Sequence, residues 1–203
     1  MAVTCTLVAD GSSDRVLIPL LEMLLDEHCP GPYRPPHLVE LPAGLSLIER
    51  IKQALDLYPC DLLFVHRDAE KESSASRAAE IRHALEEIER CPSSMLIVPV
   101  RMTESWLLVE EKAIRAAAGN PSGKTPLGLP AITKLESLPN PKQVLFDALR
   151  TASELPASRL RKFYPEEKRH GVTAQMDVDS LARLRRLPSF QHLEHQIQQH
   201  FTA

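Results

Sequence analysis

Carboxylate side chains follow three short apolar runs in this sequence, and carboxylates are well suited to binding hard divalent cations. Asp10 and Asp14 follow the first run, Asp68 and Glu70 the second, and Glu104 the third. If these runs are parallel strands, their carboxyl ends meet at one edge of a sheet, where open α/β folds bind ligands. Oxygen ligands of this kind suit Mg²⁺, with Mn²⁺ as a second choice. The pattern therefore predicts a divalent metal site and, with it, phosphoryl-transfer or phosphodiester chemistry.

Each acid also has a simpler explanation when it is taken alone. The helix dipole favours Asp and Glu in the first turn of a helix, which accounts for Asp14 or Glu104 without any ligand. It is the coincidence of acids at three separate strand ends that favours a site. Asp68 and Glu70 are two residues apart, so in an extended backbone both side chains would lie on one side and could share one cation.

Groups next to these acids could bind phosphate. Arg67 and Arg101 can each donate two hydrogen bonds to a phosphate, although ion pairs with neighbouring acids explain them as well. His66 can orient a phosphate or donate a hydrogen bond to it. A histidine at the end of a strand is, however, more often a packed and hydrogen-bonded residue.

A further group of basic residues lies in the C-terminal part of the chain: Arg159, Arg161 and Lys162. Two aromatic residues follow it directly, and a basic stretch with aromatic neighbours can follow a nucleic-acid backbone. A solvated helix face explains the same residues. The chain has a formal net charge of -3, so we expect any nucleic-acid contact to be local.

Apolar runs and amphipathic stretches alternate through residues 1–118. Strands are expected at 4–8, 37–41, 62–66 and 95–100, and helices at 45–57, 74–90 and 104–118. Another helix, which Ser12 or Ser13 can cap, is expected after the first strand, with apolar positions from 16 to 25. Alternation of this kind favours an α/β fold with a Rossmann-like, mainly parallel sheet flanked by helices. Such a sheet would bring the acids to a common edge.

Residues 119–203 have a different pattern. Pro, Gly, Ser and Lys are frequent in 119–141, which predicts a loop that opens with Gly119 after a helix. Helices are expected at 141–155, 179–187 and 189–201. We therefore expect an α/β core over 1–118, and over 119–203 a loop and helical C-terminal extension packed on the same domain. Trp106, the only tryptophan, is most simply a core residue, although it could also floor a cleft.

Composition limits the class of protein. Hydrophobic residues make up 43% of the chain and charged residues 25%, as in ordinary soluble globular proteins. The four cysteines form no Cys-x-x-Cys pair, which favours reduced thiols over zinc ligands or disulfides. The start has no basic leader, and no run approaches the roughly 18 apolar residues of a membrane span. We therefore expect a cytoplasmic protein with no membrane partner; nothing in the sequence indicates its oligomeric state.

The acidic motifs resemble those of the Toprim superfamily, in particular its small Toprim-like bacterial proteins. They are the turn from Asp10 to Asp14, the pair formed by Asp68 and Glu70, and Glu104 in its Thr-Glu-Ser-Trp context. The resemblance implies a Toprim-like fold and an Mg²⁺-dependent nuclease. It implies that Asp10 is the general acid or base, that Asp68 and Glu70 hold the ion, and that Asp14 and Glu104 support them.

Many relatives in that superfamily act beside an ATPase subunit in phage defence or DNA repair. The resemblance therefore implies a nucleic-acid substrate, DNA ahead of RNA, and an ATPase as partner. Asp10 stands where the family usually has Glu, and Glu70 where it usually has Asp. A catalytically degenerate Toprim-like module that binds without turnover is one alternative. Another is a receiver-like signalling domain that accepts a phosphoryl group on Asp68, with Thr103 after the next strand.

Overall fold

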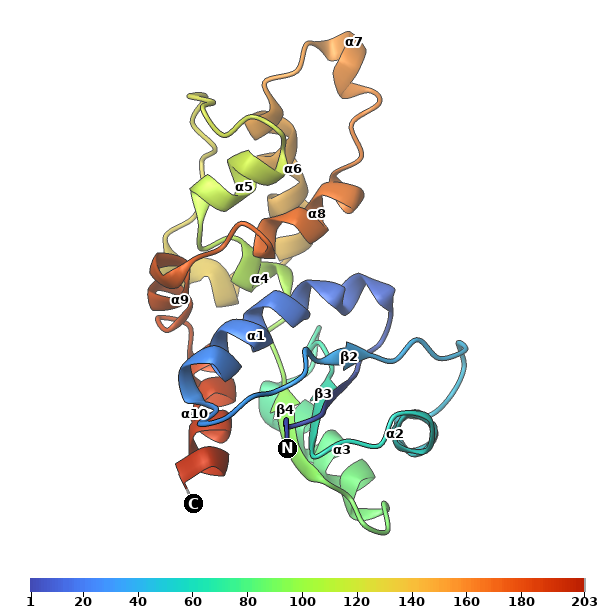
Figure 1. Ribbon diagram of the computed structural model, residues 1–203. Helices are drawn as coiled ribbons and strands as arrows, with labels where there is room; N and C mark the ends of the chain where they lie inside the picture. The colour runs from blue at the N-terminus through green and yellow to red at the C-terminus, as the bar shows by residue number, and fades with distance from the viewer. Residues whose placement is uncertain (203) are drawn as a thin grey trace. The chain divides into compact units, whose positions relative to one another are not determined.

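The computed structural model describes residues 1–202 and divides the chain into two compact units (Figure 1). Unit 1 holds Met1–Val98 and the C-terminal stretch from His192, and unit 2 holds Pro99–Gln191. The domain boundary expected at residue 118 stays a prediction, because a compact unit is a domain only if it has its own core and can fold alone.

Unit 1 contains a four-stranded, all-parallel sheet. Its strands are β1 (Cys5–Val8), β2 (His37–Leu38), β3 (Leu62–His66) and β4 (Ser93–Ile97), in the order β2-β1-β3-β4. The sheet confirms the α/β, Rossmann-like fold class. From β1 the chain moves to β2 on one side and later to β3 on the other, so the direction of winding changes between β1 and β3. Open α/β sheets bind ligands at such a switch point.

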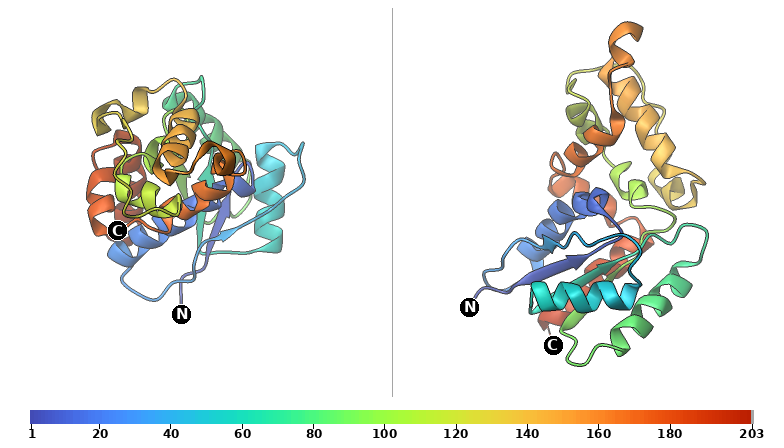
Figure 2. Two further views of the ribbon diagram at one scale, coloured as in Figure 1. Left: turned by 90° about the horizontal axis from the view of Figure 1, so that it is seen from above. Right: turned by 90° about the vertical axis from the view of Figure 1, so that its right-hand side faces the viewer.

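Helices cover both faces of this sheet (Figure 2). Helix α1 (Leu17–His28) lies on one face, and α2 (Leu47–Leu57) and α3 (Ser74–Glu86) lie on the other. Because side chains alternate along a strand, Leu63 and Val65 point toward α2 and α3 and form a buried cluster with Ile51 and Ile81. Helix α2 starts at a capping box, in which Ser46 Oγ accepts from Glu49 N at 3.3 Å and Ser46 N donates to Glu49 Oε2 at 2.8 Å.

The expected helical periodicity after β1 is confirmed. A short 3₁₀ turn, η1 (Ser12–Val16), leads into α1, whose apolar face is fully buried and consists of Leu17, Leu20, Leu21, Leu24 and Leu25. The 3₁₀ turn contains Asp14 and places it shortly after the end of β1.

The free edge of β4 is covered by the last helix, α10 (Pro188–Thr202). Leu96 N donates to Gln196 Oε1 at 2.9 Å, and Gln196 Nε2 donates to Leu96 O at 3.0 Å. One side-chain amide therefore pairs with both backbone groups of Leu96, as a neighbouring strand would. Pairing of this kind protects a sheet edge from association with other strands.

Unit 2 is helical. It consists of α4 (Glu104–Leu107), α5 (Glu111–Ala117), η2 (Ile132–Ser137), α6 (Pro141–Ser153), α7 (Ala157–Leu160), α8 (Pro165–Thr173), α9 (Val178–Leu184) and the first turn of α10. Trp106 is fully buried, packs edge-on against Phe190 at 5.2 Å between ring centroids, and donates from Nε1 to Ser189 Oγ at 2.8 Å. Trp106 is thus a core residue.

Several expected elements differ from those observed. The single helix expected at 104–118 is wrong: Glu110 is buried between α4 and α5, and its Oε1 accepts from Lys112 N at 3.2 Å as the N-cap of α5. Its Oε2 lies 3.0 Å from Nη1 of Arg183 on α9, whose side chain is 41% exposed, so Glu110 both caps α5 and forms a partly exposed ion pair. The second strand is limited to His37–Leu38, and η2, α7 and α8 lie where no element was expected.

All four cysteines are free thiols. No helix within residues 1–202 is both long and apolar enough to cross a membrane.

Candidate functional site

The loops after β1 and β3 lie side by side at the switch point of the sheet. Val8, the last residue of β1, is in register with Val65 near the end of β3. The loop after β1 carries Asp10 and Asp14, and the segment after β3 carries Asp68 and Glu70. The parallel pairing therefore brings two of the three expected acidic clusters to one edge of unit 1.

His66, the last residue of β3, connects these two loops. Its side chain is 1% exposed, and its Nδ1 lies 3.1 Å from the carbonyl oxygen of Ile97 on β4. A carbonyl oxygen can only accept, so Nδ1 carries the hydrogen of this bond. The other ring nitrogen, Nε2, lies 3.7 Å from Asp14 Oδ1 and 3.5 Å from Asp68 Oδ1. Carboxylates from two strand ends therefore converge on one buried imidazole nitrogen.

The Asp14 carboxylate is fixed by its own turn. Asp14 is 5% exposed, and its Oδ2 accepts a hydrogen bond from Gly11 N at 3.1 Å. With one oxygen held by the backbone, the other oxygen is directed toward His66 Nε2. Asp68 is more open, with 25% of its side chain exposed, so the group has a buried side and a side that solvent can reach.

Asp10 has a different environment from Asp14. Its Oδ1 lies 3.2 Å from Arg50 Nη1 and 3.3 Å from Arg67 Nε, and Arg50 Nη2 donates to the Asp10 carbonyl oxygen at 2.9 Å. Two guanidinium groups thus surround the residue that the sequence picks out for proton transfer. That role of Asp10 stays a prediction.

Arg67 bridges Asp10 to a helix. Besides the contact with Asp10, its Nη1 lies 2.7 Å from Glu80 Oε1 on α3. Arg67 therefore forms ion pairs with neighbouring acids, which is one of the two roles that the sequence suggests for it. A guanidinium group has five N–H donors, and the contacts with Asp10 and Glu80 do not use all of them. Phosphate binding by Arg67 therefore stays a prediction.

The backbone at Glu70 is not extended, so the premise that Asp68 and Glu70 share one face of a strand does not hold. Strand β3 ends at His66, and Glu70 is exposed with φ of 52°, in the left-handed region. Glu72 N donates to Ala69 O at 2.9 Å and closes a turn there. Non-glycine residues adopt this conformation rarely, and often in turns or near functional sites.

The remaining candidate residues belong to unit 2. Glu104 is 3% exposed, and its Oε1 lies 3.2 Å from Arg169 Nε on α8. Arg101 is exposed and has a left-handed backbone with φ of 67°. The three basic residues of the C-terminal part are exposed on or just after α7, namely Arg159, Arg161 and Lys162. Their expected roles stay predictions.

Arg50 is a site residue that the sequence did not reveal. It lies on α2, 40 residues from Asp10, in a stretch whose pattern predicts only an amphipathic helix. Arg50 also lines a pocket of about 200 Å³ together with Gly11, Ser12 and Glu40. No spacing in the sequence joins these residues, because the fold alone brings α2 against the loop after β1.

The chain has no match among protein-family models, curated proteins or solved structures.

Proposed function

We propose that this protein is a divalent-metal-dependent phosphodiester hydrolase, a nuclease of Toprim type, whose metal site lies at the ends of β1 and β3. The observation that carries the proposal is the convergence of Asp14 Oδ1 and Asp68 Oδ1 on His66 Nε2, at 3.7 Å and 3.5 Å. These separations are too long for strong hydrogen bonds. Two ligands of one ion with bonds of about 2.1 Å lie roughly 3.0 to 3.4 Å apart, so each carboxylate would have to move closer to Nε2 to share an ion with it.

The donor set fits Mn²⁺ or Mg²⁺. Metal-binding histidines commonly donate from their second ring nitrogen to a carbonyl or carboxylate, which fixes the tautomer. His66 makes such a contact with Ile97 O at 3.1 Å, so that Nε2 is the ring nitrogen that faces Asp14 and Asp68. Two carboxylates suit Mg²⁺, and the added imidazole favours Mn²⁺. The Toprim resemblance also implies Glu70 and Glu104 as ligands, and these two assignments stay predictions.

The chain's own residues would orient the substrate. A bound ion would neutralise charge on a phosphate oxygen and lower the pKa of a water molecule. Arg50 and Arg67 keep N–H donors beyond those used on Asp10, and these would contact the phosphate. Asp10, between the two guanidinium groups, would move the proton, as the Toprim resemblance implies.

We extend the proposal to substrate and partner on the same resemblance. DNA ahead of RNA is the proposed substrate, with an ATPase as partner in phage defence or DNA repair, in the cytoplasm. The exposed Arg159, Arg161 and Lys162 would supply phosphate contacts distant in the chain from the acids.

Cleavage of plasmid DNA with Mg²⁺ or Mn²⁺ tests the proposal. We expect nicking by the wild type and a loss of at least about 100-fold in Asp68→Asn, since even residues that merely support a metal ligand cost up to about that factor. Asp56→Asn is the matched control, because Asp56 is exposed on α2. Equal cleavage by Asp68→Asn and wild type would remove the assigned role of Asp68.

A binding module without turnover is the second candidate. Two guanidinium groups pair with the carboxylate of Asp10, the residue proposed for proton transfer. A carboxylate engaged in this way favours binding without turnover. Mn²⁺ binding without cleavage of DNA or RNA would support it. Phosphorylation of Asp68 by acetyl phosphate would instead support the receiver-like alternative.

A further inference from the structure

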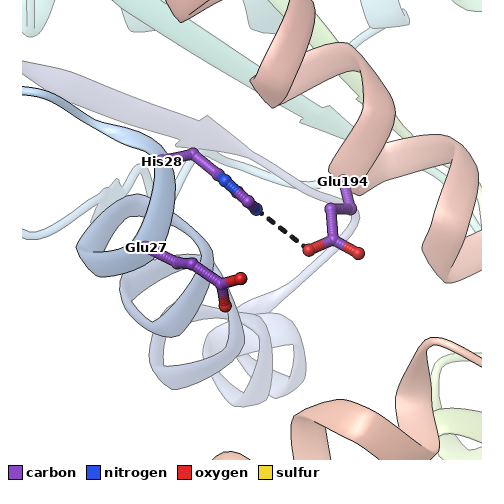
Figure 3. Close-up of side chains that lie close together, drawn as sticks. All are labelled: Glu27, His28 and Glu194. Atoms are coloured by element: carbon purple, nitrogen blue, oxygen red, sulfur yellow. Dashed lines mark hydrogen bonds and ion pairs between the residues drawn. The ribbon is translucent and has the colours of Figure 1, made fainter.

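A second cluster of metal-binding side chains lies away from the strand ends, where α1 meets α10. Figure 3 shows Glu27 and His28, at the end of α1, extending toward Glu194 on α10. One ligand atom from each of the three residues lies within 4.8 Å of the others. His28 Nε2 and Glu194 Oε1 are 2.9 Å apart.

We propose that Glu27, His28 and Glu194 bind a first-row transition ion such as Zn²⁺, which fastens α10 to α1. This inference does not rest on the proposed nuclease function, because it uses none of the residues at the ends of β1 and β3. It assigns the ion a structural role.

Burial and helix position favour a cation at this place. Glu194 is 6% exposed, and a buried carboxylate is costly unless a cation or hydrogen bonds offset the loss of water. His28 is the last residue of α1, where the unpaired carbonyl groups give the helix end a negative potential. The three side chains alone carry two negative charges when the imidazole is neutral, which equals the charge of one divalent ion.

The chemistry of the donor set selects the ion. Imidazole nitrogen and carboxylate oxygen are both ligands that zinc accepts, and three protein ligands leave a fourth position for water. Zn²⁺ binds such nitrogen and oxygen sites more tightly than Mn²⁺, and Mg²⁺ prefers oxygen ligands alone. Tetrahedral ligands at about 2.0 to 2.1 Å from zinc lie about 3.4 Å apart. His28 Nε2 and Glu194 Oε1 would therefore separate slightly from 2.9 Å.

An ion here would join distant parts of the chain within unit 1. His28 and Glu194 are 166 residues apart, and α10 also contacts the edge of β4 through Gln196. Because an ion that binds only the folded chain stabilises it by mass action, Zn²⁺ would raise the temperature of unfolding. The alternative is a plain His–Glu ion pair, which would give no such response.

The test is thermal unfolding of the full chain with Zn²⁺, after treatment with EDTA. Asp68→Asn serves as the background, so that the strand-end site contributes little. At a Zn²⁺ concentration 100 times the dissociation constant, we expect a rise of about 5 to 10 °C. Glu27→Gln should weaken Zn²⁺ binding at least about tenfold, and His28→Ala should abolish the rise.

Glu27 is exposed, so Glu27→Gln should not unfold the chain. A weaker Zn²⁺ response in this variant would therefore report a lost ligand and not a misfolded protein. Glu22→Gln, also on α1 but outside the cluster, is the matched control and should respond as the background does. A Zn²⁺ response that is unchanged in both Glu27→Gln and His28→Ala would overturn the inference. So would the absence of any Zn²⁺ response in the background protein.

Discussion

Among single residues, His66 is the one on which the proposed metal site at the ends of β1 and β3 most depends. The ring is buried, with Nδ1 donating to a backbone carbonyl and Nε2 facing Asp14 and Asp68. His66→Asn keeps an N–H donor near Ile97 O but has no equivalent of Nε2. We expect a loss of about 1 to 3 kcal/mol in stability and at least a tenfold loss in Mn²⁺ affinity, measured by calorimetry. Unchanged affinity in a folded variant would show that His66 is not a ligand.

The thiol of Cys5 should be unreactive in the folded protein. Burial in β1 is the main cause that raises the pKa of Cys5 to about 12, with smaller contributions from Cys60, Cys29 and Asp61. Alkylation requires the thiolate. We therefore expect iodoacetamide at pH 8 to leave Cys5 unmodified in the native chain and to modify it in urea, as read by mass spectrometry of its peptide. Native modification at the rate seen in urea would contradict the burial of β1.

At the scale of elements, Glu154 holds the loop that precedes η2. Its Oε1 accepts from Thr125 N and Lys124 N, each at 2.7 Å, and these bonds lower the pKa of Glu154 to about 2. A lowered pKa in the folded state means that the stabilisation is complete above the ordinary value of 4.5 and is lost as the pH falls toward 2.

Glu154→Gln should therefore lower the unfolding temperature most above pH 5, with a difference from wild type that shrinks as the pH approaches 3. Thermal scans across this range check the prediction. Glu87→Gln, an exposed carboxylate at the end of α3, is the control and should show no such trend. If the difference in unfolding temperature between wild type and Glu154→Gln instead grew as the pH fell, the lowered pKa of Glu154 would be refuted.

The ion pair between α4 and α8 should be important for unit 2. Both Glu104 and Arg169 are buried, with Oε1 and Nε 3.2 Å apart. Removing one partner leaves the other charge buried, which typically costs about 3 to 5 kcal/mol. We expect a loss of this size in Arg169→Met, measured by urea unfolding. Partial recovery of stability in the double variant Arg169→Met, Glu104→Gln would show that the two charges interact. A single variant as stable as wild type would contradict the pairing.

At the scale of the whole molecule, periodicity predicted the sheet but not the details of the site. Buried runs such as Leu62–His66 and the leucine face of α1 are long and regular, so their patterns indicate their structure directly. The helix expected at 104–118 was wrong because the backbone is extended at Glu110, whose carboxylate caps α5 and lies close to Arg183. Sequence spacing placed Asp68 correctly after β3. It missed Arg50 and Glu194, which reach their partners only through tertiary folding.

The same limit applies to the acids after β1. The sequence singled out Asp10 for chemistry by resemblance and gave Asp14 a supporting role. In the structure Asp14 lies next to His66 Nε2, while Asp10 pairs with two arginines. The difference arises from η1, whose turn holds Asp14 through Gly11 N, a feature that residue spacing does not encode.

Mn²⁺ binding followed by electron paramagnetic resonance tests whether Asp14, His66 and Asp68 hold one divalent ion, as we propose. The measurement uses the full chain with His28→Ala, so that the α1–α10 cluster does not contribute. We predict one bound Mn²⁺ in this protein and in its Asp56→Asn control, and affinity at least about tenfold weaker after Asp14→Asn or Asp68→Asn. Equal Mn²⁺ binding in all four proteins, or none in any, would contradict the claim.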